Sequence, residues 1–557
     1  MSCPRYENRR HIGLLAGERS MMADLSVDDL SVYYKKSRAI GRAGFEAGRG
    51  QIIGFIGADG AGKSSLMYAI AGVKRFEGSV TFQGHSYRSP PEAEKIKEKI
   101  GFMPQGIGLV LYKNLTANEH LDFFADIRSV KKEPWFTAYK NRLLQMAGLE
   151  KFGERRAGDL SGGMMQKLSL ICTLIHRPKL LILDEPTTGV DPLSRIELWK
   201  ILDEIRTQEG TIILVSTAYM QEAAKMDGVL LFDEGEIIAK GSVAQLLESA
   251  RPYTYEKTEK NTALNVQNRS YSLERIDANH AQPGLEALFF VNALKKRRTF
   301  PQLSISPRQR EEDPPKIVME SKGLTKTFGD FTANDHIDMV LRQGEILGLL
   351  GANGAGKTTF IKMLLGLLPV DDGELYLLGG RVKSDRERQK LKSKIGYVSQ
   401  HFALYRDMSV RENLAYFAAM HKIPVAKTGE LIGKYARELG FTDYLDEMPK
   451  DIPLGINQRF SIAAAIMHEP VVLFLDEPTS GVDAMARGQF WELLKELKQK
   501  WKIAILITTH YMSEAEYCDR VVLLKEGRKV ADERLEELYR MHPKAKNFEE
   551  IFLEYYQ

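Results

Sequence analysis

The chain has 557 residues, of which 43% are hydrophobic and 27% are charged, so it is long enough for several globular domains with sizeable cores. Its formal net charge of +4 is too small for this length to indicate a nucleic-acid partner, and we expect none. The three cysteines, Cys3, Cys172 and Cys518, match no metal-binding spacing and are typical of free thiols in a reducing compartment. No uncharged apolar run approaches the ~18 residues that a membrane-spanning helix needs. We therefore expect a cytoplasmic protein whose role at a membrane would need other subunits.

Residues 1–23 lack the apolar centre of a secretory signal, and we expect a flexible leader there. A first domain, lobe one, is expected over residues 24–247. Short β-rich runs such as IIGFIG (52–57) and KLLILDE (179–185) alternate in it with helical patterns. This alternation favours βαβ units and a mainly parallel sheet.

The chain contains an internal repeat. GADGAGKSS (57–65) returns as GANGAGKTT (351–359), and LLILDEPTTGVD (180–191) returns as VLFLDEPTSGVD (472–483) at nearly the same interval. The interval is far longer than the ~20–50 residues of solenoid repeats, so each copy is a whole domain. We expect the second domain, lobe two, over residues 316–538.

Residues 248–315, between the lobes, are polar and rich in proline, which indicates a linker. Within it LEALFF (285–290) resembles FEEIFL (548–553), so we expect a small helical terminus after each lobe, the second within residues 539–557. We interpret the basic cluster KKRR (295–298) as a solvated charged surface, with contact to lipid headgroups or RNA as the alternative.

Both lobes contain the pattern G-x-x-x-x-G-K-[ST] between a β-like run and a helical pattern, which is the context of a phosphate-binding loop. Its glycines allow the backbone to surround phosphates, and the following helix N-terminus faces the anion. The lysine neutralises β- and γ-phosphate oxygens, and the hydroxyl after it is a Mg²⁺ ligand. The predicted nucleotide-binding residues are Gly57, Asp59, Gly60, Ala61, Gly62, Lys63, Ser64 and Ser65 in lobe one and Gly351, Asn353, Gly354, Ala355, Gly356, Lys357, Thr358 and Thr359 in lobe two.

Two adjacent carboxylates follow a β-like run in each lobe. Asp184 and Asp476 are placed to hold Mg²⁺ through its coordination shell. Glu185 and Glu477 come next, where a carboxylate can orient or deprotonate an attacking water. The pairs have similar positions relative to the phosphate loops, which favours this interpretation over two ordinary strand ends.

The motif LSGGMMQK (160–167) precedes the carboxylate pair of lobe one. Together with the phosphate loops and with Gln105 and Gln400, it makes the chain resemble ABC-type ATPases with two nucleotide-binding domains, from about residue 24 onward. The resemblance implies an α/β fold of two P-loop NTPase domains in tandem. Each would have a mainly parallel core sheet, an antiparallel β subdomain and a helical signature subdomain. It also implies Mg-dependent ATP hydrolysis, with ATP and Mg²⁺ as cofactors.

In that family two domains pair head to tail, and each ATP lies between the phosphate loop of one domain and the LSGG motif of the other. The resemblance therefore implies intramolecular pairing and adds Ser161, Gly162 and Gly163 to the nucleotide-binding residues. Tyr34 and Phe328 match the aromatic residue that stacks on adenine, with a core aromatic as the alternative. The implied catalytic residues are Glu185, Gln400, Glu477 and His510. The implied metal ligands are Ser64, Gln105, Asp184, Thr358, Gln400 and Asp476, and Gln105 also counts as nucleotide-binding.

Two departures from the family pattern break the symmetry of the repeat. Pro453 and Leu454 replace the serine and first glycine of the signature in lobe two, although Gly455 is kept. Proline offers neither a hydroxyl nor an N–H, and leucine crowds the approach to the backbone. The family's γ-phosphate histidine is His510 in lobe two, whereas lobe one has Ala218 there.

Head-to-tail pairing would place both losses in one ATP site, made of the lobe-one phosphate loop and the lobe-two signature; we call it site one. Site two would combine the lobe-two phosphate loop with the intact signature of lobe one. We expect site one to bind MgATP but to hydrolyse it slowly, because its lysine, hydroxyl and carboxylates are retained. Harmless drift at the two positions is the alternative.

Within the family the chain is most similar to the ATP-binding subunits of ABC-2-type exporters of drugs or other hydrophobic or amphipathic cargo. A tandem subset of these has the signature LPLG, and this chain has IPLG at 452–455. The resemblance implies two separate transmembrane permease subunits, docked around residues 105–121 and 400–414, and a position at the inner face of the cell membrane. The alternative is a soluble tandem ATPase acting on the ribosome, a class that usually keeps LSGG in both halves. A fused sugar-importer ATPase is disfavoured because its second phosphate loop is usually the damaged one.

Overall fold

The computed structural model describes residues 23–35, 37–58, 60–106, 111–258, 264–266, 269–296, 303–308, 314–383, 387, 392–399, 404–482, 484–509 and 511–556. The predicted site residues Asp59, Gln400 and His510 lie outside these ranges, as do residues 1–22 and Arg297 and Arg298 of KKRR. Within the described ranges, no helix combines the length and the apolar character needed to cross a bilayer.

Lobe one contains two sheets. The smaller is antiparallel with the order β2-β1-β4-β5, and the larger has the order β10-β9-β3-β8-β7-β6. All neighbours in the larger sheet are parallel except β9 and β10. The central strands are apolar and fully buried, as expected of parallel strands covered on both faces. The strands are β1 (Leu25–Tyr34), β2 (Ser37–Ala47), β3 (Ile52–Gly57), β4 (Glu77–Phe82), β5 (His85–Tyr87), β6 (Ile100–Met103), β7 (Leu180–Asp184), β8 (Ile212–Thr217), β9 (Gly228–Asp233) and β10 (Glu236–Gly241).

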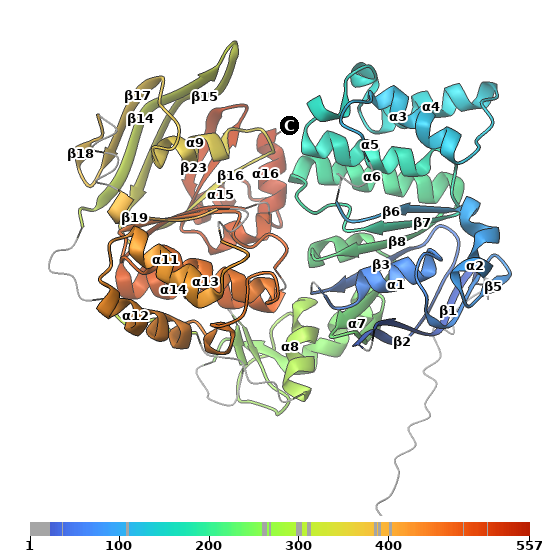
Figure 1. Ribbon diagram of the computed structural model, residues 1–557, viewed down its shortest axis with the longest axis horizontal. Helices are drawn as coiled ribbons and strands as arrows, with labels where there is room; N and C mark the ends of the chain where they lie inside the picture. Colours follow the sequence, from blue (N-terminus) through green and yellow to red (C-terminus); the bar gives the residue numbers. More distant parts are fainter. Residues whose placement is uncertain are drawn as a thin grey trace, which may run out of the picture.

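The helices of lobe one begin at recognisable caps. Thr116 and Glu119 form a capping box at the start of α3, and Asp191 caps α6, whose first residue is Pro192. Helices α3, α4 and α5 gather at the end of the lobe opposite the antiparallel sheet (Figure 1). The helices are α1 (Lys63–Ile70), α2 (Pro90–Ala93), α3 (Ala117–Ile127), α4 (Pro134–Met146), α5 (Gly162–Leu174), α6 (Pro192–Glu209) and α7 (Val243–Ala250).

Lobe two repeats this architecture, with sheets in the orders β15-β14-β17-β18 and β19-β20-β21-β16-β22-β23. The strands are β14 (Ile317–Phe328), β15 (Phe331–Arg342), β16 (Ile346–Gly351), β17 (Asp372–Leu377), β18 (Gly380–Arg381), β19 (Ile395–Val398), β20 (Val472–Asp476), β21 (Ala504–Thr508), β22 (Arg520–Lys525) and β23 (Arg528–Arg534). The helices are α9 (Lys357–Leu364), α11 (Val410–Met420), α12 (Val425–Glu438), α13 (Leu454–Ile466), α14 (Ala484–Trp501), α15 (Leu535–Met541) and α16 (Phe548–Tyr556). The predicted α/β fold with a parallel core, an antiparallel sheet and a helical part in each lobe is confirmed.

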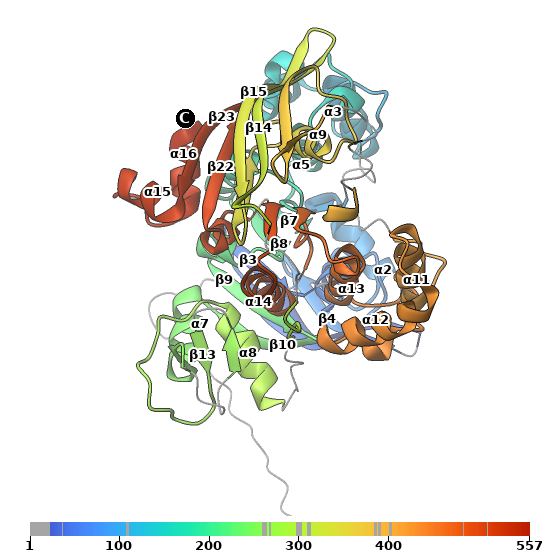
Figure 2. The same ribbon diagram turned by 90° about the vertical axis from the view of Figure 1, so that its left-hand side faces the viewer.

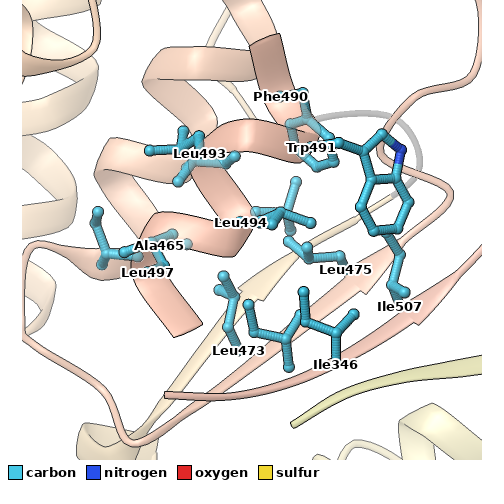
Figure 3. Packing of buried hydrophobic residues seen from close by; sticks show 14 of the residues in the cluster. Ile346, Ala465, Leu473, Leu475, Phe490, Trp491, Leu493, Leu494, Leu497 and Ile507 are labelled. Carbon is cyan, nitrogen blue, oxygen red and sulfur yellow. The ribbon is translucent and has the colours of Figure 1, made fainter. Parts of the chain in front are cut away.

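The main core of lobe two lies between its large sheet and α14. Figure 3 shows Phe490, Trp491 and Leu494 of this helix above Leu473 and Leu475 of β20. These side chains are buried, with exposed fractions of at most 2%. Burying each is worth about 1.5–3 kcal/mol, so the helix fixes the strand that ends at the carboxylate pair.

The linker has more structure than its sequence predicts. It contains a three-stranded antiparallel sheet in the order β11-β13-β12, made of Thr254–Glu256, Arg269–Tyr271 and Leu264–Val266, packed on α8 (Glu286–Lys295). The rings of Tyr271 and Phe290 join sheet and helix, with centroids 4.7 Å apart. Met485 of lobe two packs against the same cluster. The body formed by these elements, which we call the linker body, therefore touches lobe two.

A second part of the linker, residues 303–308, lies along lobe two. The amide of Ile305 donates to Glu496 Oε2 at 2.8 Å, and Trp501 Nε1 donates to the carbonyl of Ser306 at 2.8 Å. Arg308 donates to the carbonyl of Pro470 at 3.0 Å. These bonds fasten the linker to α14 and to the loop before β20.

The two lobes lie side by side in opposite orientations. In Figure 1, β14 and β15 of lobe two are at the same end of the molecule as α3–α5 of lobe one, whereas α11–α13 are at the end that holds β1 and β2. At the junction the rings of Tyr219 and Tyr511 stack with centroids 4.6 Å apart. Arg195 and Arg487 lie over these rings at 4.2 and 3.9 Å, each within its own lobe. These contacts at the junction are therefore made by equivalent residues of the two repeats.

Candidate functional site

The phosphate loop of lobe one follows β3 directly and ends where α1 begins. Gly62 has a φ of 99°, and a Cβ there would lie 2.4 Å from the carbonyl oxygen of Ala39, so the loop requires glycine. Lys63 is buried and its Nζ donates to the carbonyls of Gly57 and Ala58 at 2.8 Å each. The lysine is thus folded over a ring of backbone groups at a helix N-terminus, which suits a polyphosphate anion.

A hydroxyl and a carboxylate meet beside this loop. Ser64 Oγ donates to Asp184 Oδ1 at 3.1 Å, and Ser216 Oγ donates to the same oxygen at 2.6 Å. Hard oxygen ligands of this kind fit Mg²⁺, which binds through one or two carboxylates together with substrate phosphates. Among the residues that the structure describes, no cluster of three or more His, Cys, Asp or Glu side chains could hold a metal by itself. The residues therefore fit a magnesium ion that arrives with a nucleotide and neutralises its phosphate charge.

Glu185 lies at the centre of the lobe-one site. It is buried and accepts hydrogen bonds from Gln105 Nε2 at 2.8 Å and from Thr188 Oγ1 at 3.0 Å, while Lys63 Nζ lies 3.8 Å away. Its φ of 50° is in the left-handed region, and Glu477 has 51° at the matching position of lobe two. Backbone strain of this kind costs about 1–3 kcal/mol and concentrates at functional sites.

A cavity of about 560 Å³ opens over the lobe-one loop, lined by Tyr34, Lys63, Gln105 and Glu185 among others. The Tyr34 side chain is on the surface of this cavity, with 53% of the residue exposed, and Phe328 of lobe two is 50% exposed. A core role for these two aromatic residues is therefore wrong for both lobes. An exposed ring beside a phosphate loop, as Tyr34 has, is suited to stacking on a nucleobase.

The lobe-two loop has the same geometry. Lys357 Nζ donates to the carbonyls of Gly351 and Ala352 at 2.8 and 3.1 Å. Burial lowers the pKa of Lys357, and the charges of Glu477, Asp191 and Asp476 act in the opposite direction. Because the acidic groups help to keep this buried amine charged, it can neutralise phosphate.

One hydroxyl links the two carboxylate residues in each lobe, and the sequence did not single it out. Thr508 Oγ1 donates to Asp476 Oδ1 at 2.7 Å and accepts from the amide of Glu477 at 3.0 Å. Ser216 makes the same pair of bonds to Asp184 and Glu185 in lobe one. The available signal was a hydroxyl residue at the end of the neighbouring strand in both repeats.

The signature segments differ between the lobes at the start of the helix. Ser161 caps α5, with its Oγ accepting from the amide of Met164 at 3.3 Å. A Cβ on Gly162 would meet open space, so nothing within the chain requires a glycine there. Pro453 is the N-cap residue of α13, and its side chain makes no capping hydrogen bond. The next residue, Leu454, is half-buried, so part of its side chain lies on the surface of the first turn. An anion could approach the first turn of α5 closely, but not that of α13.

The second glycine of each signature is kept for packing. A Cβ on Gly163 would lie 2.5 Å from Ser194 Oγ, and one on Gly455 would lie 2.6 Å from the Cβ of Ala486. This contact joins each signature helix to the helix after the carboxylate pair. It explains why Gly455 persists beside Leu454.

Lobe one reaches the phosphate loop of lobe two through the segment after its own carboxylates. Asn353 Nδ2 donates to the carbonyl of Gly189 at 3.2 Å, and the charge of Asp191 acts on Lys357. A Cβ on Gly163 would lie 3.4 Å from Asp191 Oδ2, so the lobe-one signature is packed on this same segment. The structure therefore brings the signature side of lobe one towards Lys357.

Comparison with known proteins agrees with this geometry. The ABC transporter family model matches residues 40–188 and 334–480. The chain is 38% identical over 518 residues to YbhF of Escherichia coli strain K12, described as a probable multidrug ABC transporter ATP-binding protein, covering 86% of this chain and 88% of that protein. It is 35% identical over 222 residues to the Nod factor export ATP-binding protein I of Cupriavidus metallidurans, covering 40% of this chain and 72% of that protein.

The fold is also similar to a solved structure. The present chain is similar to a chain in the solved complex of the archaeal ribosomal stalk protein aP1 and the archaeal ribosome recycling factor aABCE1. The two chains have a TM-score of 0.61 and 19% sequence identity, and the match covers 92% of each. At this identity the likeness concerns the fold alone. The two matches to the family model, with a relative 38% identical over most of both chains, show that this chain belongs to the ABC transporter family, as an ATP-hydrolysing protein with two ATP-binding domains in tandem.

Proposed function

We propose that the chain is the energy-supplying subunit of an ABC-2-type membrane exporter of hydrophobic or amphipathic cargo, in which site two hydrolyses ATP and site one binds MgATP with slow turnover. The unequal turnover at the two sites is inferred from the difference between the two signature helices. The first turn of α5 has a serine hydroxyl and an open glycine, whereas α13 begins with Pro453 and Leu454. The contact between Asn353 and Gly189 supports pairing of the intact signature with the phosphate loop of lobe two.

The slower hydrolysis expected at site one follows from two missing contacts. Site one lacks the signature serine, and Ala218 provides no imidazole. A hydrogen bond to a charged group is worth about 1.5–3 kcal/mol. Two such losses correspond to turnover slower by roughly 10²–10⁴ if they add, since each 1.36 kcal/mol is tenfold in rate. Lys63, Ser64, Asp184 and Glu185 retain their geometry, so binding of MgATP is expected to persist.

The surface expected to meet membrane subunits has the chemistry of a docking site in lobe two. A groove of about 300 Å³ lies next to residues 404–414, lined by Leu404, Phe417, Met420 and His421 among others. Met420 is 62% exposed, and Tyr405 and Tyr416 lie exposed on the same helical part. Apolar grooves with exposed aromatic neighbours are common protein interaction sites. Export, rather than import, is supported by the described role of one relative, the Nod factor export ATP-binding protein I.

A pair of matched substitutions tests the inequality. Glu477→Gln should lower MgATP hydrolysis by at least about 100-fold, because it removes the water-activating carboxylate of the productive site, whereas Glu185→Gln should lower it less than about threefold. Phosphate release is measured at saturating MgATP, with nucleotide binding as the control for folding. Equal losses in the two variants would refute the inequality.

The exporter role is tested separately. Reconstitution with two permease subunits should stimulate hydrolysis and drive cargo out of vesicles. Co-sedimentation with ribosomes that depends on ATP, without any stimulation by permeases, would support the ribosome-associated alternative instead.

A further inference from the structure

The last helix of the described chain touches the phosphate loop of lobe two. Helix α16 lies beside β22 and β23 at the edge of the large sheet (Figure 2), and Lys525 at the end of β22 donates to the carbonyl of Tyr555 at 3.1 Å. The hydroxyl of Tyr556 accepts from the amide of Ala352 at 2.8 Å and donates to the carbonyl of Leu524. Ala352 is the second residue of GANGAGKT, so this tyrosine bonds directly to the nucleotide-binding loop.

Tyr556 holds the amide of the residue whose carbonyl accepts a hydrogen bond from the phosphate-binding lysine. The carbonyl of Ala352 accepts from Lys357 Nζ at 3.1 Å, while its amide is held by Tyr556. Both hydrogen-bonding ends of one residue are therefore fixed before nucleotide binds. A loop that is already ordered loses less conformational entropy when it closes around phosphate, which increases affinity.

The tyrosine is itself firmly placed. Its ring stacks on Phe552 with centroids 4.3 Å apart, and Lys525 lies over its face at 5.6 Å. Burial raises the pKa of Tyr556 to about 12, against the lowering effect of the Ala352 amide. The hydroxyl is thus protonated at neutral pH, so it can donate to Leu524 while it accepts from Ala352.

The aligned residue after lobe one cannot make this contact. Alignment of LEALFF with FEEIFL places Ala293 at the position of Tyr556, and a methyl group forms no hydrogen bond. Helix α8 is instead held to the end of β9 by Asn292, whose Nδ2 donates to Asp233 Oδ2 at 2.8 Å. The hydroxyl contact to a phosphate loop therefore exists in lobe two and has no chemical equivalent at the aligned position of lobe one.

We infer that Tyr556 is a positioning residue for ATP binding at lobe two: by holding the Ala352 peptide, it preorganises the loop that carries Lys357. The inference rests on binding of ATP by the lobe-two loop, but not on unequal hydrolysis by the two sites. One lost neutral hydrogen bond of about 0.5–1.5 kcal/mol corresponds to a roughly two- to twelvefold change in affinity.

The test uses the full chain with Lys63→Ala, which weakens the lobe-one loop so that a fluorescent ATP analogue reports on lobe two. In this background Tyr556→Phe keeps the ring and removes only the hydroxyl, and Kd for the Mg²⁺ complex should rise about two- to twelvefold. In the otherwise native chain the same variant should raise KM for ATP and leave kcat within about twofold, as expected for lost uniform binding.

Tyr539→Phe is the matched control. Tyr539 belongs to the neighbouring α15, and its hydroxyl donates to Glu516 Oε1 at 3.1 Å, away from the phosphate loop. This variant should leave Kd and KM unchanged, with a thermal midpoint similar to that of Tyr556→Phe. An unchanged Kd in Tyr556→Phe, or an equal rise in Tyr539→Phe, would overturn the inference. Undiminished binding after Lys63→Ala and Lys357→Ala together would instead contradict the assignment of the ATP sites.

Discussion

Repair of the degenerate signature is the most direct test of the unequal sites. Replacing Pro453 by Ser and Leu454 by Gly would restore the chemistry that α5 already has. The backbone is prepared for this change, because Pro453 has φ −57° and ψ 146° while Ser161 has φ −67° and ψ 161°. Gly455 is already present and packs on Ala486. The repaired segment can therefore adopt the geometry of α5 without moving the helix.

The repair should affect catalysis more than stability. A new serine cap stabilises a helix by about 1 kcal/mol, and a glycine in its first turn costs up to about 1 kcal/mol, so the two effects nearly cancel. A hydroxyl bonded to a charged phosphate is worth about 1.5–3 kcal/mol, equivalent to roughly 10–150-fold in rate. The gain is expected at site one, whose hydrolysis depends on Glu185.

The assay measures phosphate release by the native and repaired chains, each with and without Glu185→Gln. The part of the activity that Glu185→Gln abolishes should be at least about tenfold larger in the repaired chain. The mirror-image control, Ser161→Pro with Gly162→Leu, should lower total hydrolysis by roughly 10–150-fold, because it damages site two. A repaired chain with a native thermal midpoint and no Glu185-dependent gain would refute the reasoning.

Two further predictions concern stability. Burial lowers the pKa of His468 to about 4, aided by the charge of His421, whose ring lies 3.6 Å away, and by Arg308. Because the unfolded histidine has a pKa of about 6.5, its contribution is present above that pH and decreases as pH falls towards 4. Between pH 7 and pH 4.5, the free energy of unfolding should therefore fall by about 2.5 kcal/mol less in His468→Gln than in the native chain, as measured by denaturant unfolding. Parallel plots of this free energy against pH would contradict the prediction. Tyr219→Leu removes the stacking contact with Tyr511 at the lobe junction and should lower the free energy of unfolding by about 1–2 kcal/mol at neutral pH. An unchanged free energy of unfolding would show that the stacking contact does not stabilise the protein.

The sequence predicts the parts of the site that depend on local chemistry. The phosphate loops were foreseen because glycines at positive φ between a strand and a helix leave a clear pattern, and Gly62 and Gly356 have φ of 99° and 94°. The carboxylate pairs were foreseen because they follow fully buried strands. The roles of all the predicted site residues stay predictions, and Gln400 and His510 lie outside the described residues.

Contacts that depend on distant segments could not be foreseen. The bond from Ala352 to Tyr556 joins residues 204 positions apart, and no local pattern marks the tyrosine as a loop contact. The strands β11, β12 and β13 have three residues each, too few for an alternating apolar pattern, and they lie in a polar segment with several prolines. Their sheet depends on packing against α8.

The linker body and residues 303–308 have a kinetic consequence. Met485 packs on the linker body and Ile305 is buried in lobe two, so the described parts of the linker are folded or packed on lobe two, and they join the lobes covalently. A short tether gives its ends an effective concentration of the order of millimolar, far above that of separate subunits in a cell. Closure of the lobes around nucleotide is then a unimolecular event, and the specific ATPase activity should not fall when the protein is diluted.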